Sequence, residues 1–190
     1  MAGGCSFTAA FAGAVLTGGR SSRMGRDKAM IEVDGSPMAL RVATALAAAG
    51  AEPVLAIGGD GDALERLGMA WQPDRFPGEG PLGGLLTAFG ALSRAALVAV
   101  AATDLPALTA PTVSALVGAL ADHDVAVAMT DRPEPLCALW RVEVCGPVLA
   151  RAFAAGERAV HLAMAPLDRI LVAVAPGALR NINEPDDLGR

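Results

Sequence analysis

Short apolar runs alternate along the chain with longer stretches in which apolar residues recur at helical spacing. The compact runs, bounded by turn residues as buried parallel strands are, comprise residues 11–16, 53–58, 96–102, 124–129, 135–141 and 169–175. Helical patterns lie between the earlier runs, at residues 37–49, 60–67, 82–93 and 110–121. This order predicts an α/β fold, a three-layer α/β/α sandwich around a mainly parallel sheet.

The composition fits this kind of core. The chain has 190 residues, of which 53% are hydrophobic and 18% charged, so it is long and apolar enough for one domain with a sizeable core. Alanine, valine, leucine and glycine dominate and aromatic residues are few, which suits helices packed on a Rossmann-like sheet. We expect residues 1–10 to form a flexible tail and residues 11–190 a single domain.

Charge, cysteine content and hydropathy exclude several classes of protein. The net charge of −5 argues against a general nucleic-acid surface, so any phosphate binding must come from a local cluster of cations. The odd set of Cys5, Cys137 and Cys145 forms neither a disulfide framework nor a zinc motif and predicts reduced thiols in the cytoplasm. No apolar run reaches the ~18 residues of a membrane helix, and the first residues lack the basic segment of a signal peptide.

Unusual stretches follow three of the predicted strands. The loop LTGGRSSRMGRDK (16–28) follows the first strand, TDLP (103–106) follows the strand at 96–102, and NINEPDDL (181–188) follows the last strand. In open parallel sheets, ligands bind beyond the carboxyl ends of the strands. These stretches therefore predict a single binding site at one edge of the sheet.

The glycine-rich loop at residues 16–28 predicts phosphate binding. Its glycines let the backbone approach a ligand closely, and its N–H groups can point at anionic oxygens. Arg20, Arg23 and Lys28 add positive charge, which suits a polyphosphate. A solvated basic turn is the alternative, but several cations on one glycine loop favour phosphate. The spacing is not that of a Walker A loop, since no Gly-Lys-Ser/Thr sequence occurs there.

A second glycine pattern leaves other functions open. GEGPLG (78–83) matches the dinucleotide-binding fingerprint, and Asp104 lies ~20 residues further on, where an NAD site requires an acid. PDRFP separates the pattern from any preceding strand, however, and Pro81 falls inside the supposed tight turn. The alternative is a flexible loop that ends where a helix starts near Leu82. An NAD-dependent oxidoreductase is thus the rival enzyme class, and a non-catalytic nucleotide-binding module is the rival outside enzymes.

The first loop also resembles the signature of a known family. Its pattern L-x-G-G-x-S-x-R-M-G-x-D-K is similar to that of the nucleotidyltransferases that build dinucleotide forms of the molybdenum cofactor, the molybdenum cofactor guanylyltransferase family. The resemblance continues in the family's order through residues 32–38, 73–85, 103–108, 135–141, 156–158 and 181–188. The sequence departs from the family at Thr17, where alanine is frequent, and at IGG (57–59), where guanylyl-transferring members can carry a polar residue.

This resemblance implies a fold, a reaction and its substrates. The implied fold is that of the nucleotide-diphospho-sugar transferases. The implied reaction transfers GMP from GTP to the terminal phosphate of molybdenum-bound molybdopterin, with Mg²⁺ as cofactor, and releases pyrophosphate. No nucleophilic side chain is needed, because the attacking phosphate is already anionic. A CTP-using cytidylyltransferase is the close alternative. We expect neither nucleic acid nor membrane as a partner. We do expect transient contact with proteins that deliver or receive the cofactor.

Residues of the first loop are candidates for holding the triphosphate. Backbone N–H groups that can donate to its β- and γ-phosphates are those of Leu16, Thr17, Gly18 and Gly19. Arg23 and Lys28 can neutralise the charge that builds on the leaving pyrophosphate. Asp27 is more suited to orienting a neighbouring cation than to touching phosphate.

Asp104 is the candidate ligand for Mg²⁺. It ends the strand at 96–102, where a carboxylate is well placed for a cation that prefers a few oxygen ligands and retains several waters. The resemblance implies a magnesium-binding aspartate at this position. The alternative is an N-cap for the following helix, but Thr109 is the better cap because it directly precedes the helical pattern.

Asp74 is the candidate for choosing the base. The resemblance places it where the family binds the nucleotide, and a carboxylate can accept both N–H donors on the Watson–Crick edge of guanine. The backbone of Gly80–Gly84, including the candidates Gly80 and Gly83, is available to guanine O6. This arrangement favours GTP over CTP. The alternative is that Asp74 caps a turn after Pro73.

The second substrate has weaker candidates. Asn183 and Asp186 suit either that substrate or the metal, and a turn followed by a short helix is the equal alternative. Pro135, Leu136 and Trp140 are candidates for the pterin pocket, although a tryptophan in an apolar strand more often belongs to the core.

Overall fold

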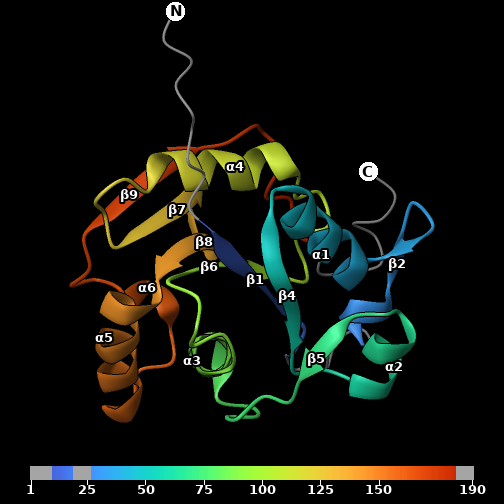
Figure 1. The fold of residues 1–190 in the computed structure, drawn as a ribbon, viewed down its shortest axis with the longest axis horizontal. Helices are drawn as coiled ribbons and strands as arrows, with labels where there is room; N and C mark the ends of the chain where they lie inside the picture. The colour runs from blue at the N-terminus through green and yellow to red at the C-terminus, as the bar shows by residue number, and fades with distance from the viewer. Residues whose placement is uncertain (1–9, 19–26, 183–190) are drawn as a thin grey trace, which may run out of the picture.

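The computed structural model describes residues 10–18 and 27–182, and its central feature is a seven-stranded sheet (Figure 1). The strand order is β5-β4-β1-β6-β8-β7-β9. The strands are β1 (Phe11–Leu16), β4 (Ala51–Ile57), β5 (Ala70–Gln72), β6 (Leu97–Ala102), β7 (Val125–Met129), β8 (Pro133–Arg141) and β9 (Arg169–Ala173). Every strand predicted from the apolar runs is present, and β5 is the member of this sheet that was not predicted.

The sheet is mainly parallel, as predicted. β8 is antiparallel to its neighbours β6 and β7, and the other neighbouring pairs are parallel. The central strands end in register, since Leu16 at the end of β1 pairs with both Ile57 of β4 and Ala102 of β6. The residues that follow these strands therefore emerge side by side at one edge of the sheet.

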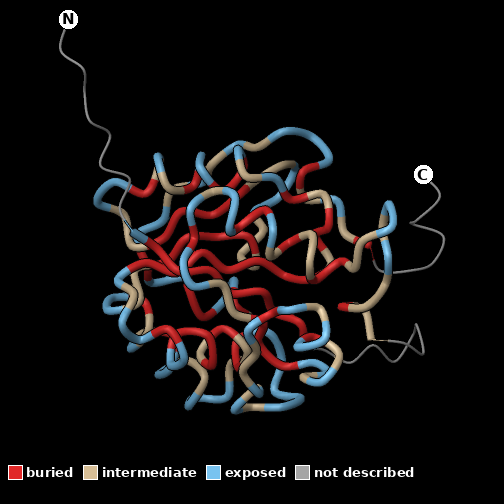
Figure 2. The backbone as a smooth tube through the Cα atoms, turned by 45° about the vertical axis from the view of Figure 1, so that its right-hand side comes forward, coloured by how far each residue is buried: buried red, intermediate tan, exposed pale blue. Residues whose placement is uncertain are grey.

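Helices cover both faces of the sheet and complete the predicted three layers (Figure 1). One face is covered by α1 (Met38–Ala48) and α4 (Ala110–Ala119), and the other by α3 (Gly80–Ala91), α5 (Val142–Ala154) and α6 (Val160–Ala163). Side chains of β6 alternate between the two faces of the sheet. Val98 and Val100 face α3, α5 and α6, whereas Ala99 and Ala101 face α1 and α4. Figure 2 shows the buried interior at the centre of the molecule, beneath more exposed helix surfaces.

Smaller elements complete the described chain. They are the 3₁₀ turn η1 (Lys28–Met30), the hairpin of β2 (Glu32–Val33) with β3 (Ser36–Pro37), and α2 (Gly61–Arg66). The four predicted helices correspond to α1, α2, α3 and α4 with small shifts of their ends. α5 and α6 were not predicted. In α5, Gly146 and Pro147 interrupt the helical pattern, and the helix forms because Cys145 and Leu149 bury against the sheet.

Several expectations outside the site can be compared with the structure. Trp140 has no exposed surface and packs edge-on against Phe89 at 6.1 Å between ring centroids, so it belongs to the core, as the alternative interpretation held. Cys137 and Cys145 are free thiols. No helix within residues 10–18 and 27–182 is both long and apolar enough to cross a membrane. The expected tail lies almost wholly outside the described residues, which begin at Ala10.

Candidate active site

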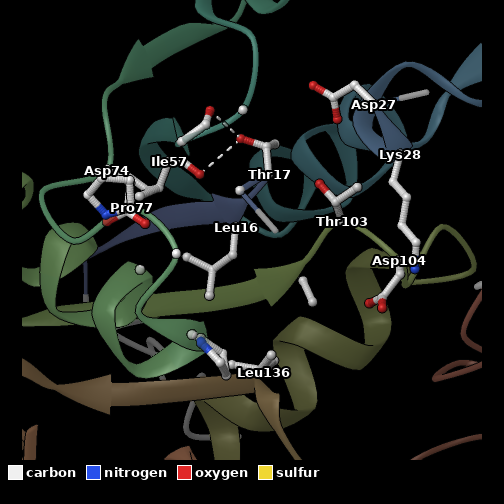
Figure 3. A pocket seen from close by; sticks show the side chains of 18 residues that line it. Leu16, Thr17, Asp27, Lys28, Ile57, Asp74, Pro77, Thr103, Asp104 and Leu136 are labelled. Carbon is white, nitrogen blue, oxygen red and sulfur yellow. Dashed lines mark hydrogen bonds between the residues drawn. The ribbon is translucent and has the colours of Figure 1, made fainter. Parts of the chain in front are cut away.

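A cleft of about 800 Å³ opens at the edge of the sheet where β1, β4 and β6 end (Figure 3). Its far wall is the start of α3. The lining residues are Leu16, Thr17, Gly18, Asp27, Lys28, Ile57, Gly58, Gly59, Asp74, Pro77, Gly78, Gly80, Pro81, Gly84, Ala102, Thr103, Asp104 and Leu136. The cleft thus combines segments that are far apart in sequence, as the strand-end argument predicted.

Most of the predicted site residues lie on this cleft. Those that line it are Leu16, Thr17, Gly18, Lys28, Asp74, Gly80 and Asp104, together with Leu136 from the pterin-pocket candidates. Gly19 and Arg23 fall outside the described residues, as do Asn183 and Asp186. Of the described candidates, Gly83, Pro135 and Trp140 do not line the cleft.

Gly83 has a packing role instead of a binding role. It is buried within α3, and a Cβ atom there would stand 2.9 Å from Cβ of Phe76. Glycine is therefore required for the close approach of α3 to the loop that precedes it. The neighbouring Gly80 and Gly84 line the cleft, so the expected contribution of this backbone to the site stays a prediction for these two glycines, whereas packing accounts for Gly83.

The start of the glycine loop is hydrogen-bonded differently from the prediction. The N–H groups of Thr17 and Gly18 both donate to the carbonyl of Ile57, at 3.0 and 3.1 Å. They extend the β1–β4 pairing by two residues, so these N–H groups are not available to phosphate oxygens. Leu16, Thr17 and Gly18 line the cleft as its floor, and the predicted donation from Thr17 and Gly18 is corrected accordingly.

The side chain of Thr17 clamps the turn after β4. Its hydroxyl donates toward the carbonyls of Ile57 at 3.0 Å and Gly58 at 2.8 Å, and Trp71 Nε1 donates to the same Gly58 oxygen at 2.8 Å. Gly58 and Gly59 both have positive φ, and a Cβ on Gly59 would stand 3.2 Å from Thr17 Oγ1. Thr17 and the glycines of IGG (57–59), the two departures from the family pattern, are thus physically linked. The threonine hydroxyl occupies space next to a turn that only glycines fit.

We expect Thr17→Val to lower the free energy of unfolding by about 1 kcal/mol, because the buried carbonyls of Ile57 and Gly58 lose a donor while side-chain volume is kept. Thr17→Ser keeps the hydroxyl and should retain most of the stability. Chemical denaturation of both variants beside the wild type measures the difference. Equal stability of the valine and serine variants would contradict the clamp.

Asp27 and Lys28 open the 3₁₀ turn η1. Asp27 caps this turn by accepting from the N–H of Ala29 at 3.0 Å, and its second oxygen accepts from the N–H of Asp60 at 3.3 Å. Asp27 thus holds backbone groups of η1 and of the α2 N-cap, and the cation-orienting role that the sequence suggests for it stays a prediction. The consequence for Lys28 is a fixed backbone, and Figure 3 shows its side chain extending across the cleft toward Asp104.

Asp104 stands at the carboxyl end of β6 and does not cap a helix. The N-cap of α4 is Thr109, as predicted, although its hydroxyl meets Thr112 Oγ1 at 3.1 Å instead of a backbone N–H. The Asp104 carbonyl accepts from the N–H of Ile182 at 3.0 Å, which holds Ile182, near the start of the NINEPDDL stretch, beside the Asp104 backbone. Burial raises the pKa of the Asp104 carboxyl, and the positive charge of Lys28 partly opposes that rise.

A further acid near Asp104 was not found from the sequence. Glu134, at the start of β8, accepts from the N–H of Leu136 at 3.1 Å. Burial raises the pKa of Glu134, and the negative charge of Asp104 adds to the rise. The pairing of β6 with β8 brings the two acids near each other, and only the tertiary fold reveals it. Cys137, on the same strand, has a pKa raised to about 12 by burial, so it is a protonated thiol and not a nucleophile.

Asp74 caps a turn and also lines the cleft. Its Oδ1 accepts from the N–H of Phe76 at 3.0 Å and from Thr87 Oγ1 at 2.8 Å, so it does cap the turn after Pro73. It also lines the cleft, and no described residue donates to its Oδ2. That oxygen is therefore available as an acceptor on the cleft, and the role of Asp74 in choosing the base stays a prediction.

The dinucleotide fingerprint does not form the turn that NAD binding requires. β5 ends at Gln72 and α3 begins at Gly80, so residues 73–79 separate the strand from the helix. The tight strand-to-helix turn of a Rossmann fingerprint is therefore missing from this segment. The other interpretation, a Gly/Pro loop that ends at a helix start, is confirmed.

The sheet, the cleft at its strand ends and the charged residues on that cleft define a nucleotidyltransferase. The chain belongs to the MobA-like NTP transferase domain family, which matches residues 13–170. It is 35% identical to a probable molybdenum cofactor guanylyltransferase of Opitutus terrae over 95% of this chain and 94% of the relative. It is 38% identical to the molybdenum cofactor guanylyltransferase of Burkholderia vietnamiensis over 82% of each chain.

A solved structure agrees with this assignment. Molybdopterin-guanine dinucleotide biosynthesis protein A from Archaeoglobus fulgidus superposes with a TM-score of 0.74 at 26% identity, over 93% of this chain and 94% of that one. The resemblance drawn from the motifs and the expected nucleotidyltransferase fold are both confirmed.

Proposed function

We propose that the protein transfers GMP from GTP to the terminal phosphate of molybdenum-bound molybdopterin and releases pyrophosphate. One observation carries the proposal: a single cleft brings together Lys28, Asp104 and Asp74, which are the cation, the acid and the base-facing carboxylate that this reaction needs. The names of the relatives support the same substrates.

The cleft suggests an orientation for the nucleotide. Lys28 and Asp104 lie at one end and Asp74 with the start of α3 at the other (Figure 3). We infer that the phosphates lie between Lys28 and Asp104 and that the base lies against Gly80 and the free Oδ2 of Asp74. Guanine presents two adjacent N–H donors to such an acceptor, whereas cytosine presents one donor group, so the arrangement favours GTP over CTP.

The chemistry requires positioning and charge neutralisation. A terminal oxygen of the molybdopterin phosphate forms a bond to the α-phosphorus of GTP, and the bond from that phosphorus to the α–β bridging oxygen breaks. Pyrophosphate leaves with the electron pair, and Lys28 neutralises part of its charge. No covalent enzyme intermediate is needed, which agrees with the protonated state of the buried Cys137 thiol.

The donor set fits a divalent cation held mainly by substrate. Asp104 offers one half-buried carboxylate, and the described residues contain no cluster of three or more side chains able to hold a metal without other ligands. Mg²⁺ suits such a site, because it binds through one or two carboxylates together with phosphate oxygens and water. When bound there, the ion would neutralise phosphate charge. Asp104 is the residue proposed to hold it.

The free thiols of Cys137 and Cys145 fit the cytoplasmic location included in this proposal. The proposal also includes transient contact with proteins that deliver the pterin or receive the finished cofactor, because both molecules pass between proteins.

A turnover assay tests the proposal and its rivals together. The purified protein is incubated with molybdenum-loaded molybdopterin, Mg²⁺ and GTP or CTP, and pyrophosphate and the pterin product are measured, while calorimetry compares the binding of GTP, CTP and NAD. We expect pyrophosphate and a guanine dinucleotide with GTP. Preferential reaction with CTP would make the protein a cytidylyltransferase. Binding of GTP without pyrophosphate release would make it a non-catalytic module.

A further inference from the structure

The hydroxyl of Thr103 is a buried polar group with no partner in the described structure. Thr103 is only 5% exposed, it lines the cleft, and its Oγ1 is buried without a hydrogen bond to any described residue. An unsatisfied buried hydroxyl costs about 1–3 kcal/mol, so such groups usually have a partner. Because Thr103 lines the cleft, the direct explanation of its missing partner is that a bound ligand supplies the hydrogen bond.

The other buried threonines show that this is an exception. Thr17 donates to backbone carbonyls, Thr87 bonds to Asp74 and to Gly83, and the hydroxyl of Thr112 meets that of Thr109. These hydroxyls are used within the protein, whereas that of Thr103 is not. Its lack of a partner is therefore specific to this position and is not a general property of buried threonines in this fold.

The backbone holds Thr103 firmly at the end of β6. Its N–H donates to the carbonyl of Leu16 at 3.2 Å, and Ala102, which precedes it, pairs with the same residue of β1. The hydroxyl is thus presented from a rigid strand end. Rotation about χ1 by ~120° exchanges hydroxyl and methyl between staggered positions, so the hydroxyl can follow a ligand without movement of the backbone.

The position of Thr103 relates it to the phosphate end of the cleft. In Figure 3 Thr103 lies on the same side of the cleft as Lys28 and Asp104, with its hydroxyl directed away from the Asp104 carboxylate, and Asp74 lies on the opposite side. A threonine hydroxyl can donate to an anionic oxygen, and Lys28, on the same side of the cleft, supplies a positive charge that attracts such an oxygen. Asp74 and the start of α3, where the base is proposed to lie, are on the other side of the cleft.

We propose that the Thr103 hydroxyl donates a hydrogen bond to a phosphate oxygen of the bound nucleoside triphosphate. This inference rests on the proposed function and assigns a binding role to a residue that sequence reasoning did not single out. A signal was available, because Thr103 directly precedes Asp104 in the TDLP stretch.

Two variants of the full chain test the proposal. Thr103→Val keeps the shape and removes the hydroxyl, and Thr103→Ser keeps the hydroxyl. Without ligand, we expect Thr103→Val to unfold at the same temperature as the wild type or higher, because the change removes an unsatisfied buried group. With GTP and Mg²⁺, its dissociation constant from calorimetry should rise by about tenfold to a hundredfold, and its nucleotide-induced stabilisation should shrink accordingly. Thr103→Ser should bind as the wild type does.

Guanosine serves as the matched ligand that lacks phosphates. Its weaker affinity should be the same for the wild type and Thr103→Val. Equal affinity of both proteins for GTP would overturn the proposal while leaving the proposed function intact. An equal loss for GTP and guanosine would place the contact on the nucleoside and also overturn it. A lower unfolding temperature of the ligand-free valine variant would indicate a structural hydroxyl. If the wild type binds no GTP, the proposed function and this inference both fail.

Discussion

Lys28→Ala should lower turnover with GTP by about 10²–10³-fold, the usual cost of losing a single electrostatic stabiliser of a transition state. The cause is charge on the leaving pyrophosphate, which grows as the bond to the α-phosphorus breaks. Lys28 is held at the first position of η1 by the cap that Asp27 provides, and its side chain reaches across the cleft. The backbone of η1 is hydrogen-bonded independently of the lysine side chain, so the fold should survive the change.

Pyrophosphate release under saturating substrates measures this effect, with thermal unfolding as the check on folding. Arg66→Ala is a matched control, because Arg66 is an exposed cation of α2 that does not line the cleft. Its turnover should equal that of the wild type. Near-normal turnover of Lys28→Ala would remove this lysine from the reaction.

Asp104→Asn should abolish the contribution of Mg²⁺ to nucleotide binding and reduce turnover by about 10²-fold or more. The amide keeps the shape of the side chain and removes the negative charge that holds the cation. Burial already disfavours the charged form of this group, as its raised pKa indicates, so the neutral amide should not weaken the fold.

Calorimetric titration of Asp104→Asn with GTP, with and without Mg²⁺, separates the affinity for the nucleotide alone from the gain in affinity that the metal adds. The affinity without metal should be kept, and the gain on adding metal should vanish. Asp122→Asn, which changes an exposed acid away from the cleft, should behave like the wild type. An undiminished metal effect in Asp104→Asn would show that the cation is held elsewhere.

The edge of the sheet that carries the site was predictable because it depends on local signals. Apolar runs fix the strands, and a parallel arrangement sends the residues after β1, β4 and β6 to the same edge. Lys28, Asp74 and Asp104 follow strands or strand-end loops, and each reaches the cleft. The charged residues and glycines at these points indicated nucleotide binding from the sequence alone, before any contact between them was known.

Other parts of the site depend on contacts between distant segments and were not predictable. Whether the N–H of Gly18 is free depends on Ile57, which becomes its acceptor only when β1 and β4 pair. Gly83 looked like a ligand-binding glycine, but the loop at Phe76 packs against it. The proximity of Glu134 to Asp104 results from the antiparallel pairing of β8 with β6, which no local pattern specifies.

A crystal structure of the protein with GTP and Mg²⁺ tests the central claim most directly. The account predicts the triphosphate in the cleft, with Lys28 and Asp104 on either side of it and guanine against Asp74. Nucleotide bound at another surface, or a cleft that stays empty at saturating GTP, would contradict it.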